Sequence, residues 1–436
     1  MKWAILGGGL TGITLANLLL EDGHEVVVLE KEAEAGGLCR SITESGFTFD
    51  IGGSHIIFSR DTGALSLMHD ALGENRGERD RNTKIFYKGR YVKYPFENGL
   101  HELPREDCFF CINEFVKTLI AVEKGELPPP ETFRDWIYYT FGRGIAETYM
   151  IPYNEKIWNF PVDRMSLHWV DGRIPRPPVE DVIRSAIGIE TEGYTHQSRF
   201  SYPETGGIEA LVRALARPLG DRVKTGYTVR SVSRDETGFL ISDGAEAVRA
   251  DRCISTIPLQ ALLPALSGVP ETVARAVADL KYNSLCCVCV GVRGEVPPYS
   301  WLYVPENDLG AFNRVSFPSN FSTRVAPEGH SSILVEITYN DGDAISRMTD
   351  GEIAAHALKG LALMGIAAEE DVAFTKVVHQ TYAYVVYDLA YQETIRTVRD
   401  YFAEREIDLV GRFSEFEYLN MDGCIRHAID FVRGRA

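Results

Sequence analysis

The sequence predicts an α/β fold in which a parallel sheet with flanking helices is interrupted by two insertions, one mostly helical and one built of antiparallel strands. Three observations predict it: a glycine-rich turn between a buried strand and a helix near the N-terminus, apolar residues at helical spacing within residues 100–200, and alternating apolar and polar residues within residues 280–386. The 436 residues are enough for two or three domains with a buried core.

A glycine-rich turn joins the first predicted strand, residues 2–6, to the first predicted helix, residues 13–20. Its pattern is Gly-x-Gly-x-x-Gly, formed by Gly7, Gly9 and Gly12. The first glycine allows the tight turn, the second lets a pyrophosphate approach the backbone, and the third lets the helix pack close to the strand. Because the N-terminus of the helix then faces the phosphates, the pattern predicts a dinucleotide site.

An acidic residue and a second pair of glycines follow the next predicted strand, residues 25–29. Glu30 ends this strand, where a carboxylate accepts hydrogen bonds from the ribose hydroxyls of a dinucleotide. Gly36 and Gly37, followed by Leu38, come soon after it. These residues extend the predicted site beyond the first turn.

The segment 30–41 resembles the glutathione-reductase-type superfamily of FAD-binding proteins, more specifically its amine oxidase and protoporphyrinogen oxidase branch. Segments 253–258 and 409–412 and the helix that begins at Met421-Asp422 carry the same resemblance. It implies a Rossmann-type FAD-binding domain, with the terminal helix directed at the flavin, where its partial positive charge stabilises the reduced, anionic form. The implied cofactor-binding residues are Gly7, Gly9, Gly12, Glu30, Gly36, Gly37, Leu38, Arg412, Met421 and Asp422.

The FAD-binding domain is therefore expected to be discontinuous, formed by residues 1–60, 202–260 and 388–436. Between these segments we expect a mostly helical substrate domain over residues 100–200 and an antiparallel sheet domain over residues 280–386. A capping-box sequence that begins at Thr349 predicts one helix inside the latter.

Further segments, in order along nearly the whole chain, resemble UDP-galactopyranose mutase. They are Gly-Gly-Ser-His at 52–55, Tyr-Pro-Phe-Glu-Asn at 94–98, 152–158 with Trp169 and Arg173, 301–303 with 312–314, and the tail 411–422. One departure is Ser54, an extra residue in front of His55. The resemblance implies an FAD-dependent isomerase that interconverts the pyranose and furanose forms of a UDP-hexose in galactofuranose and carbohydrate biosynthesis, through attack of reduced flavin N5 on the anomeric carbon.

The resemblance also implies the residues of the active site. Arg173 and Arg314 match two arginines that clamp the diphosphate, for which a guanidinium fork is well suited. His55 matches a histidine against the flavin, and Arg412 matches a residue beside it; these four are the expected catalytic residues. The expected substrate-binding residues are Tyr94, Phe96, Glu97, Asn154, Trp158, Tyr303, Tyr384, Tyr418 and Asn420.

Glu97 stands where the resemblance expects a glutamine that reads the edge of uracil. An ionised glutamate can only accept hydrogen bonds, and guanine offers two adjacent donors where uracil offers one. A GDP-sugar is therefore an alternative substrate, although UDP-galactopyranose stays the primary expectation. The main alternative function is an FAD-dependent oxidase of the amine oxidase or protoporphyrinogen oxidase type. A reductant is required, with NAD(P)H as a candidate, and the sequence leaves open whether the chain forms a homo-oligomer.

Charge and composition limit the remaining partners. Lys and Arg number 45 against 62 Asp and Glu, a net charge of −17, so the average surface repels nucleic acids and anionic membranes. An anionic ligand then needs a local cluster of arginines. No apolar run reaches the roughly 18 residues of a membrane span, and we expect neither a nucleic-acid partner nor a span.

The eight cysteines are too sparse for a disulfide framework, which favours a reducing, cytoplasmic compartment. Cys108 and Cys111 have the spacing of a redox motif, but they lie in an apolar helical pattern and are interpreted as buried thiols. No spacing of metal ligands stands out, so no metal is expected.

Overall fold

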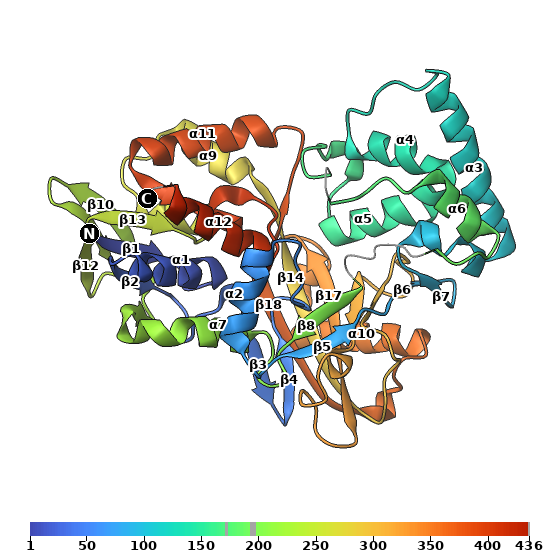
Figure 1. The fold of residues 1–436 in the computed structure, drawn as a ribbon, viewed down its shortest axis with the longest axis horizontal. Coiled ribbons are helices and arrows are strands. Elements are labelled where there is room, and N and C mark those ends of the chain that lie inside the picture. Colours follow the sequence, from blue (N-terminus) through green and yellow to red (C-terminus); the bar gives the residue numbers. More distant parts are fainter. Residues whose placement is uncertain (171–172, 192–197, 435–436) are drawn as a thin grey trace.

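The computed structural model describes residues 1–170, 173–191 and 198–434. Figure 1 shows the N-terminal and C-terminal segments side by side at one end of the molecule and the helical insertion at the other, with a large sheet between and below them. This arrangement confirms the predicted α/β fold class with one helical and one sheet insertion.

A five-stranded parallel sheet brings the first and last segments of the chain together, in the order β19-β13-β1-β2-β9. Its strands come from three distant segments of the chain, so the sheet closes only when these segments meet. Their bounds are β1 (Lys2–Leu6), β2 (Glu25–Leu29), β9 (Val223–Lys224), β13 (Arg252–Ser255) and β19 (Ile407–Leu409).

Helices and a small antiparallel sheet surround the parallel sheet. The first helix, α1, contacts the last helix, α12, so the two ends of the chain are packed together. The helices are α1 (Leu10–Glu21), α2 (Thr62–Leu72), α7 (Glu209–Ala216), α8 (Leu259–Leu262), α9 (Glu271–Asp279), α11 (Tyr391–Glu404) and α12 (Met421–Arg433); the small sheet consists of β10 (Ser231–Asp235), β11 (Gly238–Ser242) and β12 (Ala247–Ala250).

The helical insertion contains α3 (Arg105–Glu123), α4 (Phe133–Ile145), α5 (Ile151–Trp158) and α6 (Val179–Ala186). A capping box formed by Thr132 and Asp135 starts α4. Apolar residues recur at helical spacing over residues 133–149, but Gly142 has φ 70° and ψ 166° inside this stretch, and the chain continues as a π turn from Ala146 to Met150.

A seven-stranded sheet forms most of the second insertion, in the order β18-β14-β17-β16-β15-β6-β7. Strands β14 to β18 pair antiparallel as predicted, whereas β6 joins β15 in parallel and brings in a hairpin from outside residues 280–386. The predicted capping box does start α10 (Asp350–Leu363). The strands are β6 (Thr83–Tyr87), β7 (Arg90–Lys93), β14 (Lys281–Arg293), β15 (Trp301–Tyr303), β16 (Arg314–Ser316), β17 (His330–Tyr339) and β18 (Val372–Val386).

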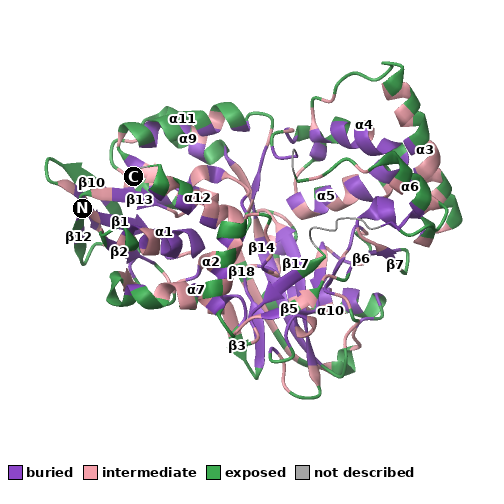
Figure 2. Ribbon diagram, viewed as in Figure 1, coloured by how far each residue is buried: buried purple, intermediate pink, exposed green. Residues whose placement is uncertain are grey.

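Two short pairs complete the fold: β3 (Ser41–Glu44) with β4 (Phe47–Asp50), and β5 (Gly77–Asp80) with β8 (Arg199–Tyr202). Strand β14 is buried along most of its length (Figure 2). All eight cysteines are free thiols, Cys111 is buried and Cys108 is partly buried, in keeping with a packing role. Among the described residues, no helix has the length and apolarity that a membrane crossing requires.

Candidate active site

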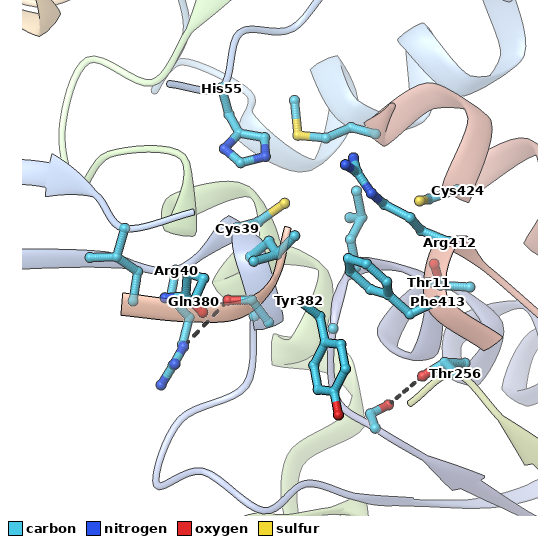
Figure 3. Close-up of a pocket in the computed structure, with 18 of the residues that line it drawn as sticks. Thr11, Cys39, Arg40, His55, Thr256, Gln380, Tyr382, Arg412, Phe413 and Cys424 are labelled. Carbon is cyan, nitrogen blue, oxygen red and sulfur yellow. Dashed lines mark hydrogen bonds between the residues drawn. The ribbon is translucent and has the colours of Figure 1, made fainter. Parts of the chain in front are cut away.

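A cavity of about 790 Å³ opens between the first glycine-rich turn, strand β18 and the start of α12. This size is typical of a ligand pocket, about 300–1,000 Å³. Its wall contains every predicted cofactor-binding residue except Gly12, and also His55, Arg314, Tyr303 and Asn420. Figure 3 shows side chains from several distant segments directed into this cavity.

The two glycine segments form one backbone cradle. Gly36 N donates to Gly8 O at 2.8 Å, and the Cα of Gly9 lies close to the space that a side chain on Gly37 would occupy. A Cβ added to Gly9 would have only the Cα of Gly37 within 4 Å, at 3.9 Å, so the space above this backbone is open. A phosphate group fits where these side chains are missing.

Gly12 acts behind the cradle. A Cβ at this position would lie 2.0 Å from the carbonyl oxygen of Gly7, so only glycine lets α1 approach the turn this closely. This explains why Gly12 shapes the cavity without lining it.

Glu30 stands at the end of β2, 7% exposed. Its Oε2 accepts from Gly8 N at 2.7 Å, and its Oε1 accepts from Glu32 N at 2.9 Å. The backbone therefore fixes the carboxylate at the cavity wall, although its contact with a ribose stays a prediction.

The N-terminus of α12 closes the opposite end of the cavity. Asn420 is the residue that caps this helix, and Met421 and Asp422 follow it on the cavity wall. The carboxylate of Asp422 accepts from Ser59 Oγ at 2.5 Å, which ties the segment after His55 to the helix. The positive end of the helix dipole thus lies at the cavity.

Arg412 enters the cavity from the turn after β19. Its Nη1 donates to Leu419 O at 3.0 Å and its Nη2 to Ala383 O at 2.5 Å, while its Nε is buried and has no hydrogen-bond partner in the described structure. The guanidinium also lies 4.9 Å from the ring centre of Tyr418. The two hydrogen bonds use two of its five N–H donors, so a fixed positive charge with three spare donors is well placed to contact a bound ligand.

His55 faces the same space as Arg412 (Figure 3). Its Nδ1 lies 2.9 Å from Gly53 O. Burial lowers the pKa of His55 to about 4, with the charge of Arg412 acting in the same direction, so the ring is neutral at pH 7. It can therefore donate or accept a hydrogen bond but brings no charge.

Arg314 lines the cavity from β16, paired with a residue that the sequence did not reveal. Its Nε and Nη2 donate to Glu336 Oε1 and Oε2 at 2.7 and 2.6 Å. Glu336 is 1% exposed. No motif marks this residue, because the pairing is created by the sheet and not by local sequence.

Arg173, the other predicted clamp residue, does not line the cavity. It is exposed, its Nη2 donates to Tyr418 O, and its guanidinium lies 4.4 Å from the centre of the Tyr418 ring. The structure therefore separates the two arginines: Arg314 is part of the cavity wall, whereas Arg173 lies outside it.

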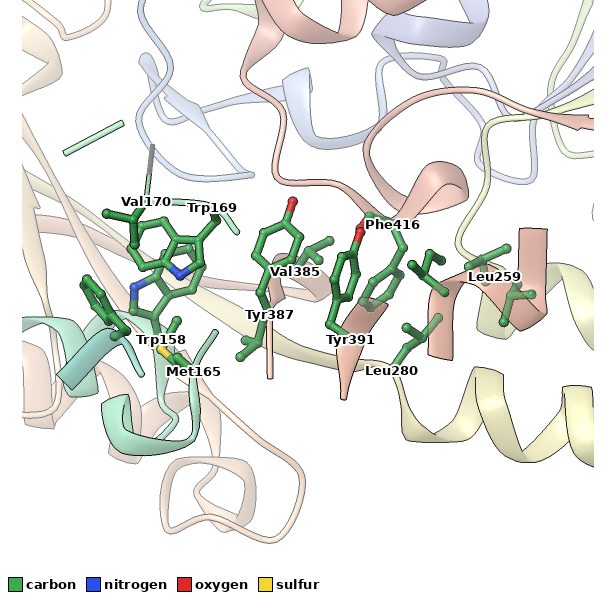
Figure 4. Close-up of a cluster of buried hydrophobic side chains, with 14 of the residues drawn as sticks. Trp158, Met165, Trp169, Val170, Leu259, Leu280, Val385, Tyr387, Tyr391 and Phe416 are labelled. Atoms are coloured by element: carbon green, nitrogen blue, oxygen red, sulfur yellow. The ribbon is translucent and has the colours of Figure 1, made fainter. Parts of the chain in front are cut away.

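The predicted tyrosines divide in the same way. Tyr303 lines the cavity, whereas Tyr384 and Tyr418 lie behind it, 5.8 Å apart between ring centres. Burial raises the pKa of Tyr384, so its hydroxyl stays protonated. Both rings contact Trp158, which belongs to a buried aromatic cluster with Trp169 (Figure 4).

Both polar groups of the Asn154 side chain are hydrogen-bonded within its own helical segment. Its Nδ2 donates to Met150 O at 2.7 Å, and its Oδ1 accepts from Trp158 Nε1 at 3.2 Å. Neither Asn154 nor Trp158 lines the cavity. Their contact with a sugar stays a prediction.

The segment 94–98 lies beside the cavity and does not line it. Tyr94 packs against Tyr303 with 5.0 Å between ring centres. Phe96 is fully buried and stacks on Tyr149 at 4.8 Å, so in this structure its ring is part of the core and not a free surface for a base. Glu97 is 4% exposed.

Sequence reasoning missed several residues of the wall. Arg40 and Arg81 line the cavity together with Arg314 and Arg412, so four arginines face it on a chain of net charge −17, although Arg40 is also paired with Glu32 at 3.5 Å. Arg81 lies 5.0 Å from the centre of the Tyr94 ring. No local pattern marks these two arginines, since only the fold brings them to the cavity.

Two thiols, Cys39 and Cys424, also line the cavity. Burial raises the pKa of both, so they stay protonated and are weak nucleophiles. Among the described residues, no group of three or more His, Cys, Asp or Glu side chains could hold a metal ion.

The parallel sheet, the glycine cradle and the positive end of α12 together define a dinucleotide-binding flavoprotein of the Rossmann type. A profile of the family described as flavin containing amine oxidoreductase matches residues 10–429. The chain belongs to this family, and its cofactor is FAD.

Solved structures give the same fold. A reduced UDP-galactopyranose mutase superposes with a TM-score of 0.90 and 27% identity, covering 100% of this chain and 96% of that one. The resemblance seen in the sequence is thus confirmed at the level of structure. A putrescine oxidase bound to putrescine has a TM-score of 0.67 and 17% identity, over 100% and 99% of the two chains, which shows the shared fold alone.

Curated relatives match over shorter stretches. An inactive all-trans-retinol 13,14-reductase of Danio rerio is 35% identical over 105 residues, 23% of this chain and 17% of that protein. A 4,4'-diapophytoene desaturase of Staphylococcus aureus is 42% identical over 166 residues, 37% of this chain and 30% of that protein. The matched part thus spans less than a third of either relative.

Proposed function

We propose that the chain is an FAD-dependent nucleotide-sugar mutase that interconverts UDP-galactopyranose and UDP-galactofuranose. The observation that carries this proposal is the superposition on UDP-galactopyranose mutase over the whole chain, at a TM-score of 0.90 and 27% identity. The cavity wall adds support, because Arg314 and Tyr303 lie opposite each other on neighbouring strands there and suit a diphosphate better than an apolar substrate.

Reduced FAD, held by the glycine cradle and the start of α12, would supply the nucleophile for displacing the nucleoside diphosphate from the sugar. The chain therefore needs no nucleophilic side chain of its own. Its residues have three other tasks: to bind the diphosphate, to stabilise the charge that grows on the leaving group, and to keep the cofactor reduced.

Arg314 and Tyr303 are placed for the first two tasks. Arg314 presents N–H donors at the wall, and Tyr303 adds a hydroxyl on the neighbouring strand. Donors that are already oriented stabilise developing charge without reorganisation, which is often the largest contribution to catalysis. Arg173, at the exposed edge, is proposed to contact the same diphosphate from the outer side.

Arg412 and the start of α12 are placed for the third task. A positive guanidinium and the positive end of a helix dipole both favour an anionic, reduced flavin. His55 is neutral at pH 7 and is proposed to hydrogen-bond the cofactor or the sugar.

The competing proposal is an oxidase, favoured by the name of the family and by the putrescine oxidase fold. One experiment separates the two. The dithionite-reduced protein is incubated with a panel of UDP- and GDP-sugars and the products are separated by chromatography, while the oxidised protein is incubated with putrescine or a porphyrinogen and hydrogen peroxide is measured. A furanose product without peroxide supports the mutase, and peroxide without a furanose supports the oxidase.

A further inference from the structure

Glu336 is a buried carboxylate directly behind the cavity wall. It lies on β17, is 1% exposed, and is not itself part of the wall. Its two oxygens receive three N–H donors: Oε1 accepts from Arg314 Nε and from the backbone N of Ser54 at 3.1 Å, and Oε2 accepts from Arg314 Nη2. One carboxylate therefore joins two separate parts of the wall.

The sheet sets the first of these contacts. Arg314 and Glu336 are directly opposite each other in the antiparallel pair of β16 and β17, and Asn313 N donates to Glu336 O at 3.0 Å. Opposite residues place their side chains on the same face at close range. The bidentate geometry consequently fixes the plane of the guanidinium as well as its position.

The second contact holds the turn that carries His55. Gly53 has φ +92°, and a Cβ there would lie 2.8 Å from Glu336 Oε2, so the turn approaches the carboxylate as closely as a glycine allows. Ser54 N completes the contact. The Ser54 hydroxyl is buried without a hydrogen-bond partner in the described structure, and Ser54 and His55 both line the cavity.

The pairing determines what Arg314 offers to a ligand. A guanidinium has five N–H donors, and Glu336 engages two of them, so three remain for the cavity. The negative charge of Glu336 offsets the positive charge of Arg314 at 2.6 Å. Arg314 therefore contributes directed hydrogen bonds more than net charge, and the direction is set by its partner.

We propose that Glu336 is a positioning residue, which aims Arg314 and fixes the Gly53–Ser54–His55 turn at the ligand cavity. The inference rests on the proposed function in one respect, namely that the ligand at Arg314 is a nucleoside diphosphate. It adds a residue that no motif marks.

A double-mutant cycle on the FAD-loaded protein tests this inference with UDP as the probe. Glu336→Gln keeps the size of the side chain, but its NH₂ group then faces an Arg314 N–H, so one arm of the fork is lost. Losing the aimed donors should weaken UDP binding roughly tenfold to a hundredfold. In an Arg314→Ala background, Glu336→Gln should change UDP affinity by less than about twofold, because the glutamine carbonyl still accepts from Ser54 N and the lost contact acts through Arg314.

The matched control is Glu209→Gln, a carboxylate that is 2% exposed, paired with Arg213 and absent from the cavity wall. It should leave UDP affinity unchanged, and FAD content and thermal unfolding show whether each variant is folded. Equal losses from Glu336→Gln with and without Arg314, or tighter UDP binding by Glu336→Gln, would overturn the inference. If the parent protein binds UDP but forms no furanose, the proposed function is wrong, but the double-mutant cycle can still be measured because it depends only on UDP affinity.

Discussion

Gly9→Ala should produce a folded protein that binds FAD poorly. Gly9 has φ −72° and ψ 179°, a conformation that any residue adopts, and a Cβ there would meet only the Cα of Gly37, at 3.9 Å. Nothing in the protein therefore resists the methyl group. A Gly to Ala change at such a position usually stabilises a protein by about 0.4–1 kcal/mol, because it restricts the unfolded chain.

The methyl group would instead occupy space that the pyrophosphate needs. Forcing an extra carbon into a filled site costs roughly 1–3 kcal/mol, which corresponds to a loss of FAD affinity of about fivefold to 150-fold. The stability and the affinity should therefore change in opposite directions. This combination distinguishes a ligand cradle from a turn that is merely tight.

The assay is a titration of the FAD-free protein with FAD, followed by quenching of flavin fluorescence, together with thermal unfolding of the same sample. Gly351→Ala is the matched control, since a Cβ at Gly351 meets nothing within 4 Å and the residue, at the start of α10, does not line the cavity. If Gly9→Ala binds FAD as tightly as the parent, or if it fails to fold, the reasoning is wrong.

Three further predictions concern the substrate and pH. Arg314→Ala and Arg173→Ala should both keep FAD, and each should lose roughly 2–4 kcal/mol of transition-state stabilisation. Only Arg314→Ala should also lose about 3–5 kcal/mol of folding stability, because it leaves the buried charge of Glu336 unpaired. Parental turnover in both variants would disprove the clamp. Glu97 is buried and does not line the cavity, so Glu97→Gln should leave the ratio of the UDP and GDP dissociation constants unchanged, and a shift from GDP toward UDP would mean that Glu97 reads the base. The pKa of His55 falls from 6.5 to about 4 on folding, so between these pH values only the unfolded state takes up this proton. The free energy of unfolding of the FAD-free protein should therefore fall by up to roughly 3 kcal/mol between pH 6.5 and pH 4. His55→Gln should flatten this pH dependence, measured by urea unfolding, and an identical profile would refute the assignment.

The features that could be predicted from the sequence are local ones. The turn from Gly7 to Gly12 and the capping box at Thr349 each depend on residues a few positions apart, so a short stretch of sequence specifies them. The break at Gly142 was missed because apolar spacing continues across it. A glycine inside a helical pattern indicates such a break only weakly.

Long-range pairings could not be predicted in this way. Strand β6 joins β15 in parallel although more than 200 residues separate them, and the contact between Arg314 and Glu336 exists only because β16 and β17 are in that register. Phe96 shows a related case, in which the segment resembles a substrate-binding motif but the ring is buried against Tyr149. Burial depends on the residues that pack against a side chain, and these come from segments outside the motif.

The most direct test of the proposed function is the conversion itself. UDP-galactopyranose is incubated with the FAD-loaded protein, either reduced with dithionite or left oxidised, and the nucleotide sugars are separated by chromatography. We expect a UDP-galactofuranose peak only with the reduced protein, the same mixture of products when the reaction starts from the furanose, and no net oxidation of the sugar. An unchanged pyranose peak with fully reduced, FAD-loaded protein would contradict the proposal.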